Sequence, residues 1–432
     1  MTAGHPAATA DVVVVGGGPA GATAAIQLAR VGRRVIIVER SVAAHKPCGG
    51  LLTPRAVASL HRLQVSPPAG AHRIDHVRFT FQTDGEHHVG GRAELPSTSV
   101  RWPADPDSAD HALVVARPEL NRRLLDEAVR LGVQLLDGHT ATAPIVERGF
   151  VRGAQVTDIA GTSFEIRATY IIVADGANSR FGRALGTFRR PSWPLAVAQR
   201  AIFRSTLHDA SEIELVAGLR DRAGTPVTGY GFMFPGGDDT VTVGTVVMST
   251  SPSFQVINMQ RLLDQVIADH GERWQLDSAS IQHPVVANAG GRIPTGSSVG
   301  PQAGPTFLVV GDAAGASNPL SGAGIEYAIE TGVIAGDVVA EALTGGSATA
   351  LQQYPKAVQA RYGTYFKVGR LTTRILGNPS VHRRLAKTAA TSPSAAAAYL
   401  RFGGNQLRPG RLGPAELAYR TGRAISRVAP DA

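Results

Sequence analysis

The chain has 432 residues, more than one domain usually holds, so two or more domains with a large core are expected. A single cysteine excludes an internal disulfide, and 13 histidines without ligand spacing argue against a metal site. The net charge of +9 is concentrated in residues 351–432, which contain 14 Lys or Arg and two acids, so the remainder is slightly acidic.

The first ten residues, "MTAGHPAATA", lack the basic and apolar regions of a signal peptide. No apolar run in the sequence approaches the roughly 20 residues that cross a bilayer. These features predict a cytoplasmic protein, and attachment to the inner face of the membrane stays open.

Residues 11–40 predict a strand, a glycine turn, an alanine-rich helix and a second strand. In this βαβ unit Gly16 allows the tight turn, Gly18 lets a pyrophosphate approach the backbone, and Gly21 allows the helix to pack closely on the strand. The free amides at the helix N-terminus favour phosphate. The segment therefore predicts a dinucleotide site.

Glu39 ends the second strand 18 residues after Gly21, where a carboxylate accepts hydrogen bonds from a ribose. A 2′-phosphate would be repelled there, so the nucleotide is FAD or NAD. The residues that the sequence assigns to this part of the cofactor site are Gly16, Gly18, Pro19, Ala20, Gly21, Glu39 and Arg40.

Between and after these elements the chain changes character. Residues 74–100 and 195–285 contain short alternating runs such as "TVTVGTVVM" and "GYGFMF", which predict antiparallel sheet. We expect this sheet to form a platform over the cofactor, with the active site between the two.

Three further segments resemble nucleotide-binding pieces. Residues 114–136 predict a helix with Arg117 at its entry, followed by a strand. Residues 170–186 begin with an apolar strand that ends at Asp175, and residues 306–343 begin with a strand that ends at Gly311-Asp312. One alternative role for Asp312 is to cap the helix that follows it.

After residue 345 the sequence predicts helices with a basic surface. At 100° per residue, Lys356, Lys367, Arg370 and Arg374 share a sector. The residues on the opposite side are Val358, Tyr362, Tyr365 and Leu376. Such a helix either packs on the protein with a solvated basic face or lies on an anionic bilayer, and we favour packing.

These motifs resemble the flavoprotein family that contains the aromatic hydroxylases and the geranylgeranyl reductases. The resemblance implies FAD as cofactor, Asp312 on its ribityl chain, Arg117 along the FAD, and backbone amides after Asn318-Pro319 near the isoalloxazine. The further cofactor residues that it assigns are Cys48, Gly49, Arg117, Asp175, Gly311, Asp312, Pro319, Gly322, Gly324 and Ile325. One GxGxxG motif of this type occurs, so the electron donor is either NAD(P)H bound transiently or another donor, including a protein.

The segment around the lone cysteine resembles one branch of this family, the geranylgeranyl reductases. Lys46-Pro47-Cys48-Gly49 is similar to a motif of geranylgeranyl reductases, and "LTPRAV" at 52–57 is similar to its form in the actinobacterial menaquinone reductases. Many members have Asp or Glu two residues after the cysteine, whereas this chain has Gly50. A proton-transfer role for that carboxylate is therefore absent or filled elsewhere.

A second family motif, Tyr-x-Trp-x-Phe-Pro, is read here as Tyr230 to Pro235, with Phe232 in place of the tryptophan. The Gly-x-Gly that follows it ends in Val246. Alternate aromatic rings of one strand share a face. The face suits an isoprenoid chain, although ordinary sheet core explains each ring as well, and both changes alter the expected pocket width.

The sequence thus predicts an FAD-dependent reductase that hydrogenates C=C bonds of a polyprenyl chain, either a geranylgeranyl group or a menaquinone side chain. The candidate catalytic residues are Cys48, Tyr230 and Phe232. The alternatives are an FAD monooxygenase or halogenase and a non-catalytic prenyl-binding protein. The expected partners are an isoprenoid lipid, an electron donor and an anionic membrane surface, and no nucleic acid.

The predicted fold class is α/β: a discontinuous Rossmann-like FAD domain of the aromatic-hydroxylase type, an inserted antiparallel sheet and a helical C-terminal region. The FAD domain is assigned to 1–73, 101–190 and 286–345. The sheet is assigned to 74–100 and 191–285, and the basic helical region to 346–432.

Overall fold

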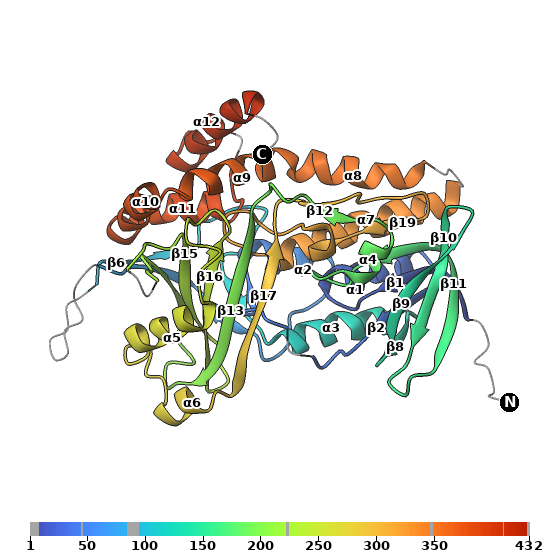
Figure 1. Ribbon diagram of the computed structural model, residues 1–432, viewed down its shortest axis with the longest axis horizontal. Helices are drawn as coiled ribbons and strands as arrows, with labels where there is room; N and C mark the ends of the chain where they lie inside the picture. The colour runs from blue at the N-terminus through green and yellow to red at the C-terminus, as the bar shows by residue number, and fades with distance from the viewer. Residues whose placement is uncertain are drawn as a thin grey trace.

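A computed structural model describes residues 8–44, 46–83, 95–221, 224–345, 349–408 and 410–429. Two large sheets lie side by side, and a layer of helices from the C-terminal half covers both (Figure 1). Residues 84–94 of the predicted sheet segment and the last residues of the predicted basic region lie outside the described residues.

The first sheet is the nucleotide-binding type that the sequence predicts. Its strand order is β8-β2-β1-β11-β10-β9, with β19 paired to the end of β11. The strands β1, β2, β8, β11 and β19 run parallel, whereas β10 runs antiparallel to both of its neighbours, β11 and β9. Their bounds are β1 Ala8–Val15, β2 Val35–Glu39, β8 Gln134–Asp137, β9 Thr140–Glu147, β10 Phe150–Thr157, β11 Ser163–Val173 and β19 Phe307–Val309.

The strand β1 lies inside this sheet and is buried on both faces, which explains the unbroken apolar sequence Val12 to Val15. Val12 and Val14 pack with residues of the helices α1 and α7, whereas Val13 and Val15 pack on the other face with Phe181. The helices around this sheet are α1 Pro19–Arg30, α2 Pro54–Arg62, α3 Arg117–Arg130, α4 Arg180–Ala184 and α7 Ile325–Gly345. The predicted βαβ unit and the predicted helix after Arg117 are both present.

The second sheet forms the predicted platform, in the order β17-β13-β16-β15-β14-β5-β6. All its neighbours are antiparallel except β14 and β5. Its strands are β5 His76–Phe81, β6 Ser97–Arg101, β13 Leu195–Arg204, β14 Glu212–Ala217, β15 Gly229–Pro235, β16 Thr240–Met248 and β17 Val286–Pro294. The strand β17 pairs with β13 and so extends this sheet past residue 285, where the sequence places the end of the platform.

Short elements connect these layers. They are β3 Leu51–Leu52, β4 His72–Ile74, β7 Ala112–Val114, β12 Phe188–Arg189, β18 Val299–Gly300, α5 Met259–His270 and α6 Ser278–Gln282. The strands β3, β7 and β4 form a small sheet beside the loop of residues 46–50.

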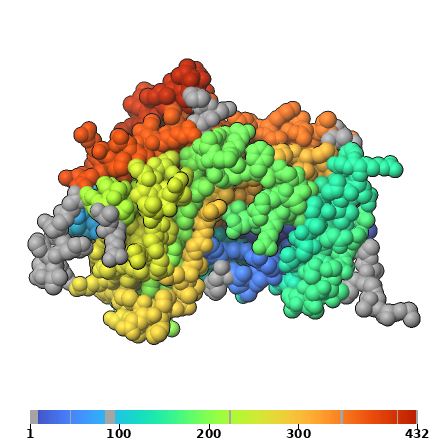
Figure 2. All heavy atoms as spheres, in the orientation of Figure 1, coloured from blue at the N-terminus to red at the C-terminus, as the bar shows by residue number. Residues whose placement is uncertain are grey.

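The C-terminal region is helical, as expected. Its helices are α8 Gln353–Val358, α9 Thr364–Leu376, α10 Pro379–Thr391, α11 Pro393–Gly403 and α12 Pro414–Val428. They form the orange and red layer of Figures 1 and 2. The helices α10 and α11 pack against β5 and β6 of the platform.

The prediction that the basic sector is solvated is wrong for one of its members, Arg370. The apolar residues Tyr362 and Tyr365 are buried as expected, but Arg370 is only 5% exposed. Its guanidinium lies over the Trp193 ring, 3.5 Å from the centroid, and Nη1 donates a hydrogen bond to the Gly296 carbonyl. Arg370 therefore joins the tail to the body because an aromatic face and a carbonyl replace water around its charge.

Candidate active site

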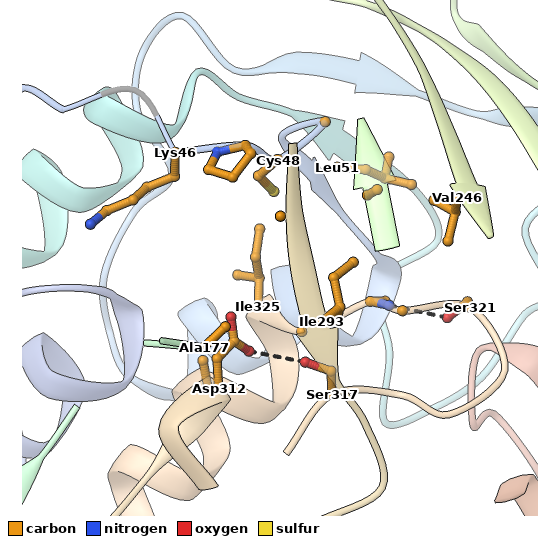
Figure 3. A pocket seen from close by; sticks show the side chains of 18 of the residues that line it. Lys46, Cys48, Leu51, Ala177, Val246, Ile293, Asp312, Ser317, Ser321 and Ile325 are labelled. Atoms are coloured by element: carbon orange, nitrogen blue, oxygen red, sulfur yellow. Dashed lines mark hydrogen bonds between the residues drawn. The ribbon is translucent and has the colours of Figure 1, made fainter. Parts of the chain in front are cut away.

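A central pocket of about 760 Å³ lies between the two sheets. We call it the central pocket; its walls come from the first sheet, the loops at 46–54 and 317–325, the platform and the helices α9 to α11. Figure 3 shows Lys46 and Cys48 on one side of it and Asp312 and Ile325 on the other. This volume is near the upper end of the usual range for ligand sites, as an extended ligand requires.

The glycine turn borders one end of the central pocket. Gly16 has φ +105°, and a Cβ there would lie 2.4 Å from the Ala174 carbonyl oxygen, so glycine is required. A Cβ on Gly18 would meet nothing within 4 Å and would project into open space at the start of α1. That space, beside the free amides of a helix N-terminus, fits a pyrophosphate.

Glu39 is buried at the expected place. Its Oε2 accepts a hydrogen bond from the Gly17 amide at 2.6 Å, and Oε1 accepts one from the Ser41 amide at 3.0 Å. Each carboxylate oxygen has a second lone pair, so both can also accept from a ribose hydroxyl. Arg40 beside it is exposed at the edge of the pocket.

Two buried polar groups face the same space without a partner. Oδ1 of Asp175 and Nε of Arg117 make no hydrogen bond, although both residues line the pocket. Burial raises the pKa of Asp175. Unpaired buried polar atoms are costly, so these two are expected to meet a polar ligand. Together with the glycine turn, they fit an extended dinucleotide.

Asp312 sits beneath the middle of the pocket. Its Oδ1 accepts a hydrogen bond from Ser317 Oγ at 2.9 Å (Figure 3). A Cβ on Gly324 would come within 3.1 Å of the same oxygen, so the glycine leaves room for this pair. The alternative role of Asp312 as a helix cap is wrong, because α7 begins only at Ile325.

The loop carrying the cysteine is folded tightly. The Lys46 carbonyl accepts a hydrogen bond from the Cys48 amide at 2.8 Å, and the Gly50 amide donates to Cys48 Sγ at 3.4 Å. A Cβ on Gly49 would lie 2.7 Å from the Phe234 ring, so Gly49 lets the loop contact the aromatic strand. Cys48 is thus held in the pocket wall with its sulfur accepting an N–H.

The aromatic residues of β15 share the pocket face, as the alternation predicts. The rings of Phe232 and Phe234 stack with centroids 4.4 Å apart. The Tyr230 hydroxyl donates to the Ser321 carbonyl at 2.6 Å, and burial raises the pKa of this phenol. The phenolic proton is therefore engaged in holding the loop at 317–325, which favours a positioning role for Tyr230.

Most of the predicted site residues border the central pocket. They are Gly16, Gly18, Pro19, Ala20, Glu39, Arg40, Cys48, Gly49, Arg117, Asp175, Tyr230, Phe232, Asp312, Gly322, Gly324 and Ile325. Gly21, Gly311 and Pro319 are not in its lining. Gly21 packs on the Gly16 carbonyl, Gly311 on Ala20, and Pro319 on Gly369, so these three shape the surrounding turns.

Sequence reasoning missed several lining residues. Thr53 belongs to the "LTPRAV" segment but was assigned no role, and His139 comes from a loop without a motif. Arg200 is a charged residue within the mostly apolar strand β13, which is the one signal that could have revealed it. Leu385 and Tyr399, on α10 and α11, line the pocket from the tail. Their contribution depends on how the tail folds back, and no local pattern reports that.

A buried carboxyl lies one residue beyond the pocket lining. Glu326 is only 1% exposed, and burial raises its pKa to about 6, although Arg55 opposes the shift. Thr53, which does line the pocket, donates its hydroxyl hydrogen bond to Glu326. The site therefore has a carboxyl that keeps its proton to a higher pH than an ordinary glutamate and is linked to the pocket by one hydroxyl.

Comparisons with known proteins agree with this geometry. Residues 9–218 match the family model described as an FAD binding domain. A menaquinone reductase of Mycobacterium tuberculosis is 34% identical over 373 residues, which cover 86% of this chain and 85% of that protein. A digeranylgeranylglycerophospholipid reductase of Methanothermobacter thermautotrophicus is 30% identical and covers 82% of this chain and 83% of its own length.

Solved structures show the same fold. A geranylgeranyl bacteriochlorophyll reductase-like protein of Thermoplasma acidophilum superposes with a TM-score of 0.73 at 21% identity, over 93% of this chain and 97% of that one. A flavin-dependent brominase superposes with a TM-score of 0.69 at 16% identity, over 97% and 98% of the two chains.

Proposed function

The chain belongs to the geranylgeranyl reductase family of FAD-dependent oxidoreductases, and from this membership we propose that it hydrogenates the polyprenyl side chain of menaquinone. The observation that carries the proposal is that the residues that fit a dinucleotide and the Cys48 thiol border one space, the central pocket. The rings of Tyr230, Phe232 and Phe234, which we call the aromatic strip, border the same space. The 34% identity to a protein named menaquinone reductase favours the quinone over other prenyl lipids.

FAD fits the residues described above. We propose that Gly18 and the α1 amides hold its pyrophosphate, Glu39 its adenosine ribose, and Asp312 its ribityl chain. Reduced FAD supplies a hydride when it is bound there. The rest of the reaction, which adds H⁻ to one alkene carbon and H⁺ to the other, depends on how the protein orients the chain, excludes water and delivers the proton.

The aromatic strip answers the first two requirements. Phe232 and Phe234 are nearly buried and stacked, so the wall they form is apolar and rigid. When one alkene carbon receives the proton, cationic character develops on the other carbon, and the negative face of an aromatic ring stabilises it. Water that would capture such a carbon is excluded by the same wall.

Cys48 is the proposed proton donor. Its sulfur lies in the pocket wall, and the Gly50 amide stabilises the thiolate left after the proton has moved. We propose Glu326 as a second proton source, because Thr53, which lines the pocket, donates a hydrogen bond to its carboxyl. With Cys48 or Glu326 as the proton source, the reaction does not need the Asp or Glu that many family members have at the position of Gly50.

The similarity to the brominase keeps an oxygen-using reaction as the alternative. Residues 230–235 contain no tryptophan, and the phenylalanines there form an apolar wall. A reductase works without oxygen, whereas a monooxygenase or halogenase consumes it in proportion to product. The reductant is proposed to be NAD(P)H bound transiently or a donor protein.

The substrate is tested in cells. Lipids from cells with the gene are expected to contain menaquinone that is two hydrogens heavier than the menaquinone of cells lacking it, as measured by mass spectrometry. A shift that appears in another prenyl lipid, with menaquinone unchanged, would move the proposal to that lipid class. No shift in any prenyl lipid would contradict the reductase function.

We further propose that the protein works at the surface of an anionic membrane. Among the described residues, no helix is long and apolar enough to span a bilayer. Leu385 and Tyr399 line the central pocket and are 54% and 43% exposed, so the pocket reaches the surface at α10 and α11. Arg384 and Lys387 flank Leu385 and are exposed. An apolar opening bordered by cations suits a lipid entrance on anionic lipid.

The holoprotein is expected to sediment with anionic vesicles at low salt and to be released at high salt. Arg384→Gln/Lys387→Gln should weaken this binding about thirtyfold, because each basic residue near the surface contributes about 1 kcal/mol. The matched control is Arg122→Gln/Arg183→Gln, which removes two exposed arginines from α3 and α4. Equal binding of neutral and anionic vesicles would contradict the proposal.

A further inference from the structure

Arg200 is a buried cation that the proposed chemistry leaves without a task. It is only 3% exposed, and it lines the central pocket from β13. Its Nη2 donates a hydrogen bond to the Lys46 carbonyl at 3.0 Å, whereas Nε and Nη1 are buried without a partner. In the described part of the chain no carboxylate forms an ion pair with it.

A buried guanidinium destabilises the folded protein unless a hydrogen-bond acceptor or an anion pairs with it. Burial lowers the pKa of Arg200, which reflects the cost of its charge, yet an arginine stays protonated in proteins. Leaving two of its three nitrogens unpaired adds a further penalty. The site is therefore complete only when an acceptor enters the pocket and receives these hydrogen bonds.

The register of the platform places Arg200 beside the aromatic strip. Arg200 pairs with Gly244 on β16, and Gly244 pairs with Phe232 on β15, so the three occupy one row across the sheet. A Cβ on Gly244 would lie 2.2 Å from the Phe232 ring, which shows that the ring covers the glycine. On the other side β17 offers only Ala289, Gly290 and Gly291, which leave room around the guanidinium.

We infer that Arg200 binds the oxygen-bearing head group of the prenyl substrate and so sets which isoprene unit of the chain lies beside Cys48. This inference rests on the proposed function. The ligand is an oxygen acceptor, which a quinone carbonyl and a diphosphate both supply, and the planar fork of Arg200 can reach either. The chain then runs from that end along the aromatic strip. Arg200 lies on the platform, whereas the groups assigned to FAD belong to the first sheet, to α3 and to the loops at 46–54 and 317–325.

The test compares ligands with and without a head group. Menaquinone, geranylgeranyl diphosphate and a headless polyprene hydrocarbon are titrated into the holoprotein, and Kd is read from the change in the flavin absorption spectrum. In Arg200→Gln, Kd for at least one head-bearing ligand should rise at least about tenfold, while Kd for the hydrocarbon stays unchanged. The ligand whose binding is weakened identifies the head group that Arg200 contacts. Arg200→Lys should recover part of the loss, and Arg204→Gln, at the exposed end of the same strand, should change nothing.

Three results would overturn the inference. Equal weakening of all three ligands, or a shifted flavin reduction potential with unchanged Kd values, would show that Arg200 acts on the flavin or the loop. Unchanged Kd values and potential would show that it has no binding role. If Arg200→Gln does not fold, the Arg200→Lys variant provides the same comparison. Failure of the proposed function is distinct, since wild-type holoprotein would then reduce none of the three compounds.

Discussion

Gly18→Val is expected to give a folded chain that contains no FAD. The backbone at Gly18 has φ −69° and ψ 179°, an extended conformation that valine adopts without strain. The new Cβ has no protein atom within 4 Å and stands where we propose that the pyrophosphate approaches α1. Losing those charge-assisted hydrogen bonds should weaken FAD at least about a hundredfold. Visible absorption gives the FAD content, and circular dichroism and thermal unfolding give the fold.

The control for this variant is Gly345→Val. Gly345 ends α7, is exposed, and its Cβ would also meet nothing within 4 Å, so the same substitution is made away from the pocket. It should remain yellow. Gly21→Val is a poor substitute, because its Cβ would lie 2.0 Å from the Gly16 carbonyl and would disrupt the fold itself. A Gly18→Val protein that keeps its full complement of FAD would contradict the assigned site.

Cys48→Ser is expected to keep the flavin spectrum and lose most of the alkene reduction. Serine fits the same space, but its hydroxyl is a far weaker acid than a thiol, whose ordinary pKa is about 8.5. Proton delivery by a positioned group contributes about a hundredfold or more, so the rate of reduced-flavin oxidation by substrate should fall by about that factor. Stopped-flow absorption without oxygen measures this step directly.

Cys48→Ala separates chemistry from packing. If the thiol donates the proton, the alanine and serine variants should be similarly slow, and both should bind substrate with the wild-type Kd. If the sulfur only fills space next to Gly50, serine should be close to wild type. Wild-type turnover in Cys48→Ser would remove the thiol from the mechanism and leave Glu326, through Thr53, as the proton source.

Local patterns predicted the elements that depend on local physics. Val12 to Val15 form a strand that is buried on both faces, and the glycines that follow it form the turn into α1. The strand and the turn were both predicted from the spacing of these residues alone. The alternation in Tyr230 to Phe234 likewise fixed which rings share a face. Much of the candidate site could be named because the motifs lie at the ends of these strands.

The features that sequence reasoning missed arise from contacts between distant segments. Arg370 belongs to a basic sector by periodicity, yet it is buried because Trp193 and Gly296, far away in the chain, surround it. Asp312 lies in the 3₁₀ helix Gly311–Ala314 and pairs with Ser317, because α7 begins only at Ile325. The pocket walls supplied by Tyr399 and Leu385 depend on the same long-range packing.

The most direct test of the reductase function uses purified holoprotein, reduced chemically and mixed without oxygen with menaquinone whose side chain is fully unsaturated. Mass spectrometry should show a product two hydrogens heavier, with the added hydrogens in the side chain, and a single addition should oxidise one equivalent of flavin. Unchanged menaquinone together with an oxygenated or halogenated product that forms only in air would contradict it.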